Sequence, residues 1–183
     1  MLIGTFQWYQ DQAPGLINAF ESTANENDGG SEPIPNSALL ADTQNAKFAV
    51  KPKTTYLVHV INMGSFVGSY LKIVGHQMTI VEIDGVYTES QAVDELYLTV
   101  AQRYSVLITT KADTSQNFAI LNTLDTTMFD HVPPGANSDV YGYLIYDSSK
   151  PLPPVSPLRD YTVFDDFQLI PKDRQLALTN VDQ

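Results

Sequence analysis

The sequence predicts an all-β domain, a Greek-key β-sandwich or barrel with a few short helical turns. Two observations lead to this fold class. Short segments rich in β-branched and aromatic residues follow one another along the middle of the chain. Turn-forming residues separate these segments at short intervals, which favours a Greek-key arrangement over βαβ units.

Length and composition agree with a single globular domain. The chain has 183 residues, of which 43% are hydrophobic, so it can bury a core and is not disordered throughout. Its 10 Lys and Arg residues against 21 Asp and Glu residues give a formal net charge of -11, which disfavours nucleic acid and anionic membranes as partners. The lack of cysteine excludes disulfides, thiolate zinc sites, a cysteine nucleophile and any copper site that needs a thiolate.

The first part of the chain predicts a strand, a short helix and a long loop. Residues 2–8 are apolar and aromatic, as is typical of a strand. Residues 13–20 carry hydrophobic side chains at near-helical spacing, enough for about two turns. Residues 21–35 are polar and rich in turn formers, and loops longer than about a dozen residues are usually functional or mobile. The N-terminus lacks the basic and apolar regions of a signal peptide, and no apolar run approaches the ~20 residues of a membrane span.

The centre of the chain predicts a series of strands. Asp84 and Gly85 form a strong tight-turn signal between two of them. The expected strands are residues 55–61, 69–74, 77–83, 95–100, 104–109, 118–121 and 141–146.

The sequence changes character after residue 146. Residues 150–157 are rich in proline, so we expect them to run extended along the surface, outside any sheet. Residues 164–167 could form a helical turn that packs Phe164 and Phe167. The tail has little to bury.

The residues alone indicate no autonomous catalytic motif. The histidines at positions 59, 76 and 131 are too far apart in sequence for a local metal motif, and we expect His59 and His76 to be structural, hydrogen-bonded residues. The chain has no Gly-x-Ser-x-Gly elbow, and residues 64–68 are too short for a phosphate-binding loop.

Several segments in order resemble the middle, second cupredoxin-like domain of three-domain multicopper oxidases. They are YLVHVIN at residues 56–62, GHQMTIVEIDG at 75–85, VAQRYSVL at 100–107 and NFAI at 117–120. The resemblance implies one cupredoxin-like domain over residues 1–172 and a tail or interdomain linker over 173–183. Many relatives carry His where this chain has Gln10. The strings SEPIP at residues 31–35 and TTMFD at 126–130 look most like the fungal iron-uptake ferroxidases and their close oxidase relatives.

The resemblance also implies what this chain lacks. In such enzymes the copper ligands lie on His-x-His and His-Cys-His motifs of the first and third domains, and neither motif occurs here. We therefore expect a chain without copper of its own, inactive alone, that packs between those two domains in a copper-containing parent enzyme. The family further implies an extracellular or cell-surface parent.

By the same resemblance, the middle domain provides two carboxylates to the Fe(II) substrate site. They fall on Glu32 in SEPIP and Asp130 in TTMFD, 98 positions apart, and we expect them to approach each other. Hard carboxylate oxygens favour the oxidised ion and so help the electron to leave. Asp125 and His131 flank this cluster as candidates for supporting the site.

Two other functions stay open at this stage. The parent enzyme could be a laccase-like oxidase of phenols or pigment precursors, whose middle domain shares the scaffold motifs. The chain could instead be a free-standing, non-catalytic β-sandwich that binds a partner. The sequence gives neither the substrate of the parent enzyme nor the oligomeric state.

Overall fold

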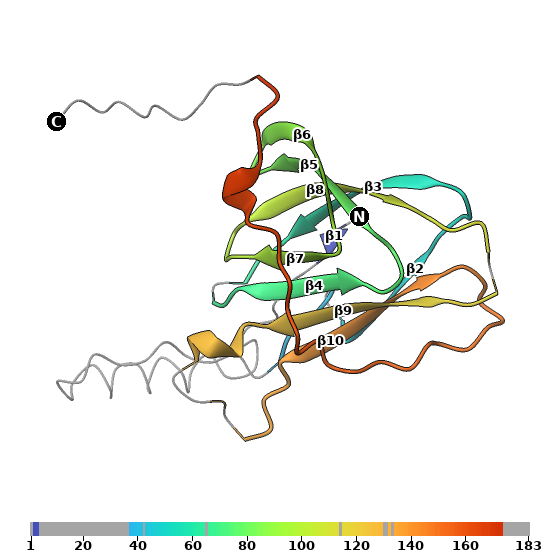
Figure 1. The fold of residues 1–183 in the computed structure, drawn as a ribbon. Coiled ribbons are helices and arrows are strands. Elements are labelled where there is room, and N and C mark those ends of the chain that lie inside the picture. The colour runs from blue at the N-terminus through green and yellow to red at the C-terminus, as the bar shows by residue number, and fades with distance from the viewer. Residues whose placement is uncertain are drawn as a thin grey trace, which may run out of the picture.

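The chain folds into two five-stranded sheets that pack face to face (Figure 1). The structure is a computed structural model that describes residues 2–3, 37–41, 43–64, 66–113, 115–129, 132 and 134–173. The first sheet has the order β1 (Leu2–Ile3), β3 (Thr55–Ile61), β8 (Arg103–Thr109), β5 (Met78–Ile83) and β6 (Val86–Val93). The second has the order β2 (Asn45–Ala49), β10 (Asp139–Ile145), β9 (Phe118–Leu124), β4 (Ser69–Ile73) and β7 (Glu95–Leu98). The predicted all-β sandwich is confirmed.

The chain passes back and forth between the sheets, which gives the sandwich its crossed connectivity. It runs from β3 to β4 in the other sheet, returns for the β5–β6 hairpin, crosses to β7, returns to β8 and crosses again to β9. Most neighbouring strands are antiparallel, whereas β1 with β3 and β2 with β10 are parallel pairs. The tight turn predicted at Asp84 and Gly85 joins β5 to β6, and both residues have positive φ angles of 48° and 89°.

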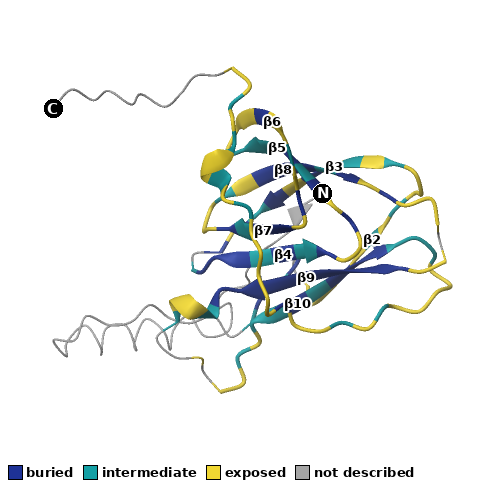
Figure 2. Ribbon diagram, in the orientation of Figure 1, coloured by how far each residue is buried: buried dark blue, intermediate teal, exposed yellow. Residues whose placement is uncertain are grey.

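The main core lies between the sheets and follows the two-residue period of the strands. In β3, Val58 and Val60 are buried, whereas Leu57 and His59 point away from the core and are exposed (Figure 2). In β9, all seven residues are buried, so this strand is covered on both faces. Its outward-facing Ala119 and Leu121 form a second, smaller cluster with Leu158.

The segment that covers β9 is the strap, residues 150–164, which follows β10 without joining either sheet (Figure 1). The buried side chain of Asn117 holds its beginning, because its Nδ2 donates to the carbonyl oxygens of Asp147, Lys150 and Pro151 at 3.1–3.3 Å. Further along, Nη1 and Nη2 of Arg159 donate to the carboxylate of Asp139 at 3.0 and 2.7 Å. The expectation of an extended surface course for residues 150–157 is confirmed.

After the strap, the chain forms a short 3-10 helix, η2 (Asp166–Gln168), and then lies along β6. The Nε2 of Gln102 and the hydroxyl of Tyr104 both donate to Asp166, at 2.8 and 2.9 Å. Glu89 N donates to Ile170 O at 2.8 Å, so this stretch extends the edge of the first sheet.

The expected packing of residues 164–167 is correct for one phenylalanine and wrong for the other. Phe164 is partly buried against the core, but Phe167 is 96% exposed. The reason is that η2 begins only at Asp166, so Phe164 lies in extended chain and does not share a helix face with Phe167.

The seven predicted central strands are all present, with ends shifted by a few residues. Two strands, β2 and β6, were not predicted. The expected helix at 13–20 and loop at 21–35 lie outside the described residues, and the predicted strand at 2–8 is described only at residues 2–3, where it forms β1. Within the described part, no helix is long and apolar enough to cross a membrane.

Candidate functional site

The predicted site residues divide into those that the structure describes and those that it does not. Glu32, Asp130 and His131 lie outside the described residues. Asp125 is described, as are the following residues up to Phe129. The expected approach of Glu32 to Asp130 therefore stays a prediction, whereas the segment that leads into Asp130 can be built from its contacts.

Asp125 directly follows β9 and caps the short 3-10 helix η1 (Thr126–Met128). Its backbone N donates to Gly68 O at 2.8 Å. Its side-chain Oδ1 accepts hydrogen bonds from the N and the Oγ1 of Thr127, as an N-cap residue does. Its Oδ2 accepts a hydrogen bond from the hydroxyl of Tyr97 at 2.9 Å. Asp125 is 7% exposed, and both of its carboxylate oxygens are hydrogen-bonded within the domain.

The other end of η1 is fixed by Phe129. Its backbone N donates to Thr126 O at 3.2 Å, and its ring packs against that of Phe66, with the centroids 5.9 Å apart. Asp130 follows Phe129 directly in the sequence. The residue before the predicted iron ligand is therefore held by packing as well as by hydrogen bonding.

A row of three tyrosines lies beside Asp125. The ring centroids of Tyr97 and Tyr70 are 4.8 Å apart, and those of Tyr70 and Tyr161 are 3.7 Å apart and stacked. Burial, followed by the hydrogen bond to Asp125, raises the pKa of Tyr97 well above its ordinary value. Sequence reasoning missed this row because the three residues come from β4, β7 and the strap.

The two described histidines have structural partners, as predicted. His59 Nδ1 lies 2.9 Å from Ser105 Oγ, which donates in turn to Glu82. His76 lies between Val74 O at 3.1 Å and the Tyr146 hydroxyl at 2.7 Å. Burial lowers the pKa of His76 below its ordinary value, with a smaller lowering by Lys111 and an opposing effect of the hydrogen bond to Val74.

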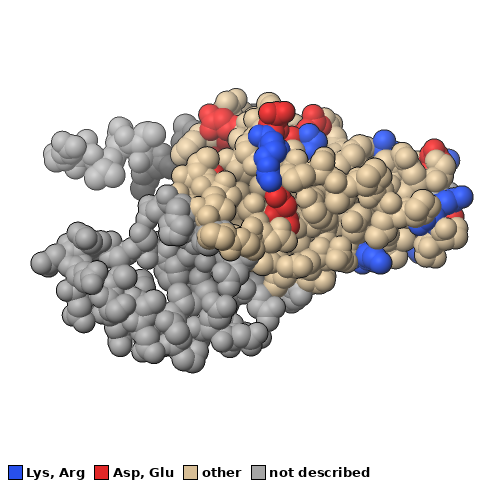
Figure 3. Space-filling model, turned by 90° about the horizontal axis from the view of Figure 1, so that it is seen from below, with Lys and Arg blue, Asp and Glu red and all other residues tan. Residues whose placement is uncertain are grey.

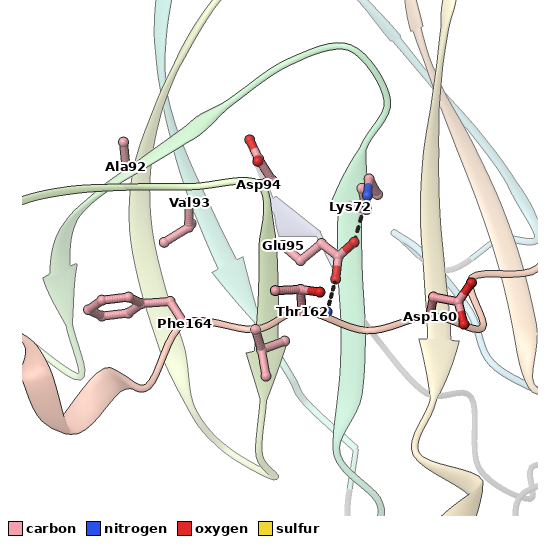
Figure 4. Close-up of a pocket in the computed structure, with 9 residues that line it drawn as sticks. Lys72, Ala92, Val93, Asp94, Glu95, Asp160, Thr162 and Phe164 are labelled. Carbon is pink, nitrogen blue, oxygen red and sulfur yellow. Dashed lines mark hydrogen bonds and ion pairs between the residues drawn. The ribbon is translucent and has the colours of Figure 1, made fainter.

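A cavity of about 540 Å³ lies between β4, the end of β6, β7 and the strap (Figure 4). Its polar centre is the carboxylate of Glu95, which is 4% exposed. One oxygen of Glu95 accepts from Lys72 Nζ at 2.6 Å and the other from the backbone N of Thr162 at 2.8 Å. Because both oxygens are satisfied within the domain, this arrangement attaches the strap to the sheet edge and leaves no carboxylate oxygen of Glu95 unpaired.

Two sheets with this connectivity and a capped turn at the end of β9 are compatible with several families of β-sandwich. A model of the multicopper oxidase family matches residues 1–149, which is most of the chain. The chain belongs to the multicopper oxidase family. Its cupredoxin-like fold and the resemblance recognised in the sequence agree with this assignment.

Relatives that match almost the whole of this multicopper oxidase chain are named iron transport multicopper oxidases. FET3 of Gibberella zeae is 43% identical over 176 residues, which is 96% of this chain and 28% of that protein. FET3 of Saccharomyces cerevisiae is 41% identical over 170 residues, which is 92% of this chain and 26% of that protein. The chain thus spans only slightly more than a quarter of the length of these relatives.

Solved multicopper oxidases share the fold. The crystal structure of Fet3p, a multicopper oxidase that functions in iron import, matches with a TM-score of 0.87 and 39% identity over 94% of this chain and 32% of that chain. A laccase from B. aclada matches with a TM-score of 0.68 and 21% identity over 87% of this chain and 31% of that chain. The second likeness shows the fold alone.

The family implies copper, but the described residues do not fit a copper centre. Among them, no three His, Cys, Asp or Glu side chains lie close enough together to hold a metal ion. The full sequence contains no cysteine for a thiolate ligand. His59 and His76 are engaged with Ser105 and with Val74 and Tyr146, as described above.

Proposed function

We propose that this chain is the middle cupredoxin-like domain of an iron-oxidising multicopper oxidase. In this role it supports the first and third domains and contributes Glu32 and Asp130 to the site of the Fe(II) substrate. The observation that carries the proposal is the 41–43% identity to iron transport multicopper oxidases over nearly the whole chain. Identity to Fet3p is 39%, compared with 21% for the laccase, which favours iron over phenols as the substrate.

The chemistry of the proposed site follows from its ligands. Carboxylate oxygens are hard donors that bind the ferric ion more tightly than the ferrous ion, so they lower the reduction potential of the bound iron. Fe(II) then loses one electron to become Fe(III). That electron would pass to copper in the parent enzyme, since the chain belongs to the multicopper oxidase family. The contribution of the chain is to bind and orient the ion.

Asp125 serves this site through the backbone rather than as a ligand. One of its carboxylate oxygens accepts from Tyr97 and the other from Thr127, so Asp125 orders η1, which ends two residues before Asp130. His131 is a further candidate for supporting the site, as a neighbour of Asp130 in the sequence.

As a middle domain, the chain would pack against two neighbouring domains, with residues 1–172 forming the domain and 173–183 a linker. The described surface has features suited to such packing. On the face seen in Figure 3, uncharged side chains cover most of the described surface, with acidic and basic side chains close to one another. Among the described residues, the aliphatic, methionine and phenylalanine side chains at least 45% exposed are Leu57, Met63, Val86, Met128, Val132, Phe167 and Ile170. We further infer an extracellular or cell-surface location for the parent enzyme, in line with the iron-transport names of the relatives.

The proposal is tested in the intact multicopper oxidase that carries this segment. We expect the double variant Glu32→Gln, Asp130→Asn to slow iron oxidation and raise the KM for Fe(II), while phenol oxidation stays close to that of the unchanged enzyme. A matched control is the double variant Glu89→Gln, Asp160→Asn, which neutralises two exposed carboxylates and should alter neither activity. Equal loss of both activities in the first variant would contradict the proposal, because it would indicate damaged folding or electron transfer.

A further inference from the structure

Tyr97 connects the strand β7 to the turn that precedes Asp130. Its hydroxyl donates to Asp125 Oδ2 at 2.9 Å, while Asp125 Oδ1 accepts from the N of Thr127 at 3.1 Å and from its Oγ1. One carboxylate oxygen thus orders η1 and the other is held by Tyr97. Hydrogen bonds on both oxygens restrain the orientation of the Asp125 side chain.

The packing around the Tyr97 hydroxyl requires glycine at position 68. A Cβ atom on Gly68 would overlap the hydroxyl oxygen and the adjacent ring carbon of Tyr97. The carbonyl oxygen of Gly68 also accepts the hydrogen bond from Asp125 N at 2.8 Å. Gly68 therefore makes room for the phenol and holds the backbone of the residue that the phenol contacts.

The ring of Tyr97 is itself held in place. It packs against Tyr70 with the centroids 4.8 Å apart, and Tyr70 stacks on Tyr161 of the strap at 3.7 Å. A phenol with the ordinary pKa of about 10 already keeps its proton at neutral pH. Burial and the hydrogen bond to Asp125 raise the pKa of Tyr97 further, so the hydroxyl remains a donor. The donor is therefore fixed in both position and protonation state.

We propose that Tyr97 is a positioning residue for the iron site, acting through Asp125 on the turn that leads to Asp130. This inference rests on the function proposed above. Phe129, the residue between η1 and Asp130, is bound to Thr126 and packed on Phe66, so an ordered η1 fixes the backbone from which Asp130 follows. Functional side chains must be held to within about 0.5 Å of their working geometry, and groups behind the ligands provide that restraint.

The test is Tyr97→Phe in the intact multicopper oxidase that carries this segment. The variant removes only the hydroxyl and keeps the stacked ring. We expect the KM for Fe(II) to rise about 2- to 10-fold, the equivalent of one net hydrogen bond, with kcat and phenol oxidation nearly unchanged. Tyr87→Phe is the matched control, because Tyr87 is 66% exposed, and it should change none of these constants. Equal losses with iron and phenol for Tyr97→Phe would overturn the inference.

The variant Asp130→Asn separates the inference from the proposed function. If Tyr97 acts through Asp130, Tyr97→Phe should add no further rise in the KM for Fe(II) in the Asp130→Asn background. Fully additive effects would overturn the inference and leave the proposed function standing. An unchanged KM for Fe(II) in Asp130→Asn alone would instead overturn the proposed function.

A second pair of measurements covers the case in which Tyr97→Phe folds poorly. Thr127→Val keeps Tyr97 but removes the Oγ1 donor to Asp125 on an exposed residue, and it should also raise the KM for Fe(II). In the 183-residue chain, the amide of Thr127 should exchange with solvent faster in Tyr97→Phe than in Tyr87→Phe. The inference would be overturned if neither the KM for Fe(II) in Thr127→Val nor the exchange rate of the Thr127 amide in Tyr97→Phe changed.

Discussion

The outer faces of the two sheets differ in their polarity and in the segment that packs on them. On β3, β8 and β5, the outer face carries a polar row in which His59 contacts Ser105 and Ser105 donates to Glu82, with His59 exposed to solvent. On β9, the outer face is apolar and lies beneath the strap, where Leu121 packs with Leu158. Among the described residues, cross-strand hydrogen bonds join the polar groups of the first face, whereas a segment without regular structure covers the second.

This difference appears in the strand sequences. In β3, buried and exposed residues alternate, which is the pattern of a strand covered on one face. In β9, all seven residues are buried, which is the pattern of a strand covered on both faces. The stability of the second sheet should therefore depend on the strap, and the following changes test that dependence.

The largest effect is expected from truncating a side chain beneath the strap. Leu121 is 8% exposed and Leu57, on the open face of the other sheet, is 51% exposed. We expect Leu121→Ala to lower the free energy of unfolding by about 2–4 kcal/mol, as in a core, and Leu57→Ala by less than about 1 kcal/mol. Urea unfolding of both variants measures this difference. Equal losses would contradict the claim that the strap makes the outer face of β9 part of the core.

The next effect concerns the residue that begins the strap. Asn117 is 3% exposed, and its side chain donates to three carbonyl oxygens and accepts from the backbone N of Tyr146 and of Asp147. Asn117→Ala leaves these groups without their partner, so we expect a loss of about 2–3 kcal/mol in the free energy of unfolding.

The control for this change is Asn45→Ala, at an exposed position of β2, where we expect a change within about 0.5 kcal/mol. Limited proteolysis of the strap supplies an independent measurement, because cleavage should be faster in Asn117→Ala. Unchanged stability together with unchanged cleavage would mean that the strap is anchored mainly by its later contacts, at Arg159 and Thr162.

The sequence allowed the prediction of strands whose pattern is local, and it failed where distant contacts decide the structure. The β-branched and aromatic residues of β3 and β8 predict those strands directly. In contrast, β2 contains Asn, Ala and Lys, which have low strand propensity, and it exists because it pairs in parallel with β10, almost a hundred residues away. β2 turns only Ala46 and Phe48 toward the core, and β6 carries many exposed residues without regular alternation, so neither strand has a strong pattern of buried hydrophobic residues.

The candidate site also has one part that a local sequence pattern predicts and another that depends on distant contacts. Asp125, with Thr127 two residues later, carries a local capping signal, and the structure has that cap. The contact of Asp125 with Tyr97 joins residues 28 positions apart, and the need for glycine at position 68 arises only from that contact. The assignment of Glu32 and Asp130 to iron came from family resemblance, since two carboxylates without local spacing carry no metal signal of their own.

A smaller, pH-dependent effect is expected at His76, which lies in the connection between β4 and β5 against Phe118 and Tyr146. Because its pKa is lowered in the folded state, the unfolded chain binds the proton more tightly. The stability that His76 provides is present above its ordinary pKa of about 6.5 and is lost as the pH falls from there through the folded pKa. The slope from one such group is at most about 1.4 kcal/mol per pH unit.

Urea unfolding between about pH 7 and pH 5 measures this effect in the unchanged chain and in His76→Gln. We expect the unchanged chain to lose more stability over this range than the variant does. A steeper loss in the variant would show that the sign is wrong and that the folded state prefers the charged imidazole.

The smallest effect is expected at the turn where the chain crosses from the strap-covered sheet to the open sheet, between β7 and β8. Gln102 N donates to Thr99 O at 3.2 Å, which closes a four-residue turn with Ala101 in the third position at a φ of 64°. A positive φ at this position favours glycine, because a Cβ atom is strained there. The positive φ costs alanine about 1–2 kcal/mol, which a glycine would not lose. Glycine has more conformational freedom in the unfolded chain, and this lowers the stability gained by the substitution by about 0.5–1 kcal/mol.

We therefore expect Ala101→Gly to raise the free energy of unfolding by about 0.5–1 kcal/mol. Ala92→Gly, at an exposed position within β6, is the matched control and should lower it by a similar amount, because there the alanine has ordinary strand geometry. Urea unfolding of the two variants gives opposite signs if the turn is strained as described. If both variants were destabilised, the prediction would be wrong. Ala101 would then be unstrained in solution, and the turn between β7 and β8 would accommodate alanine as well as glycine.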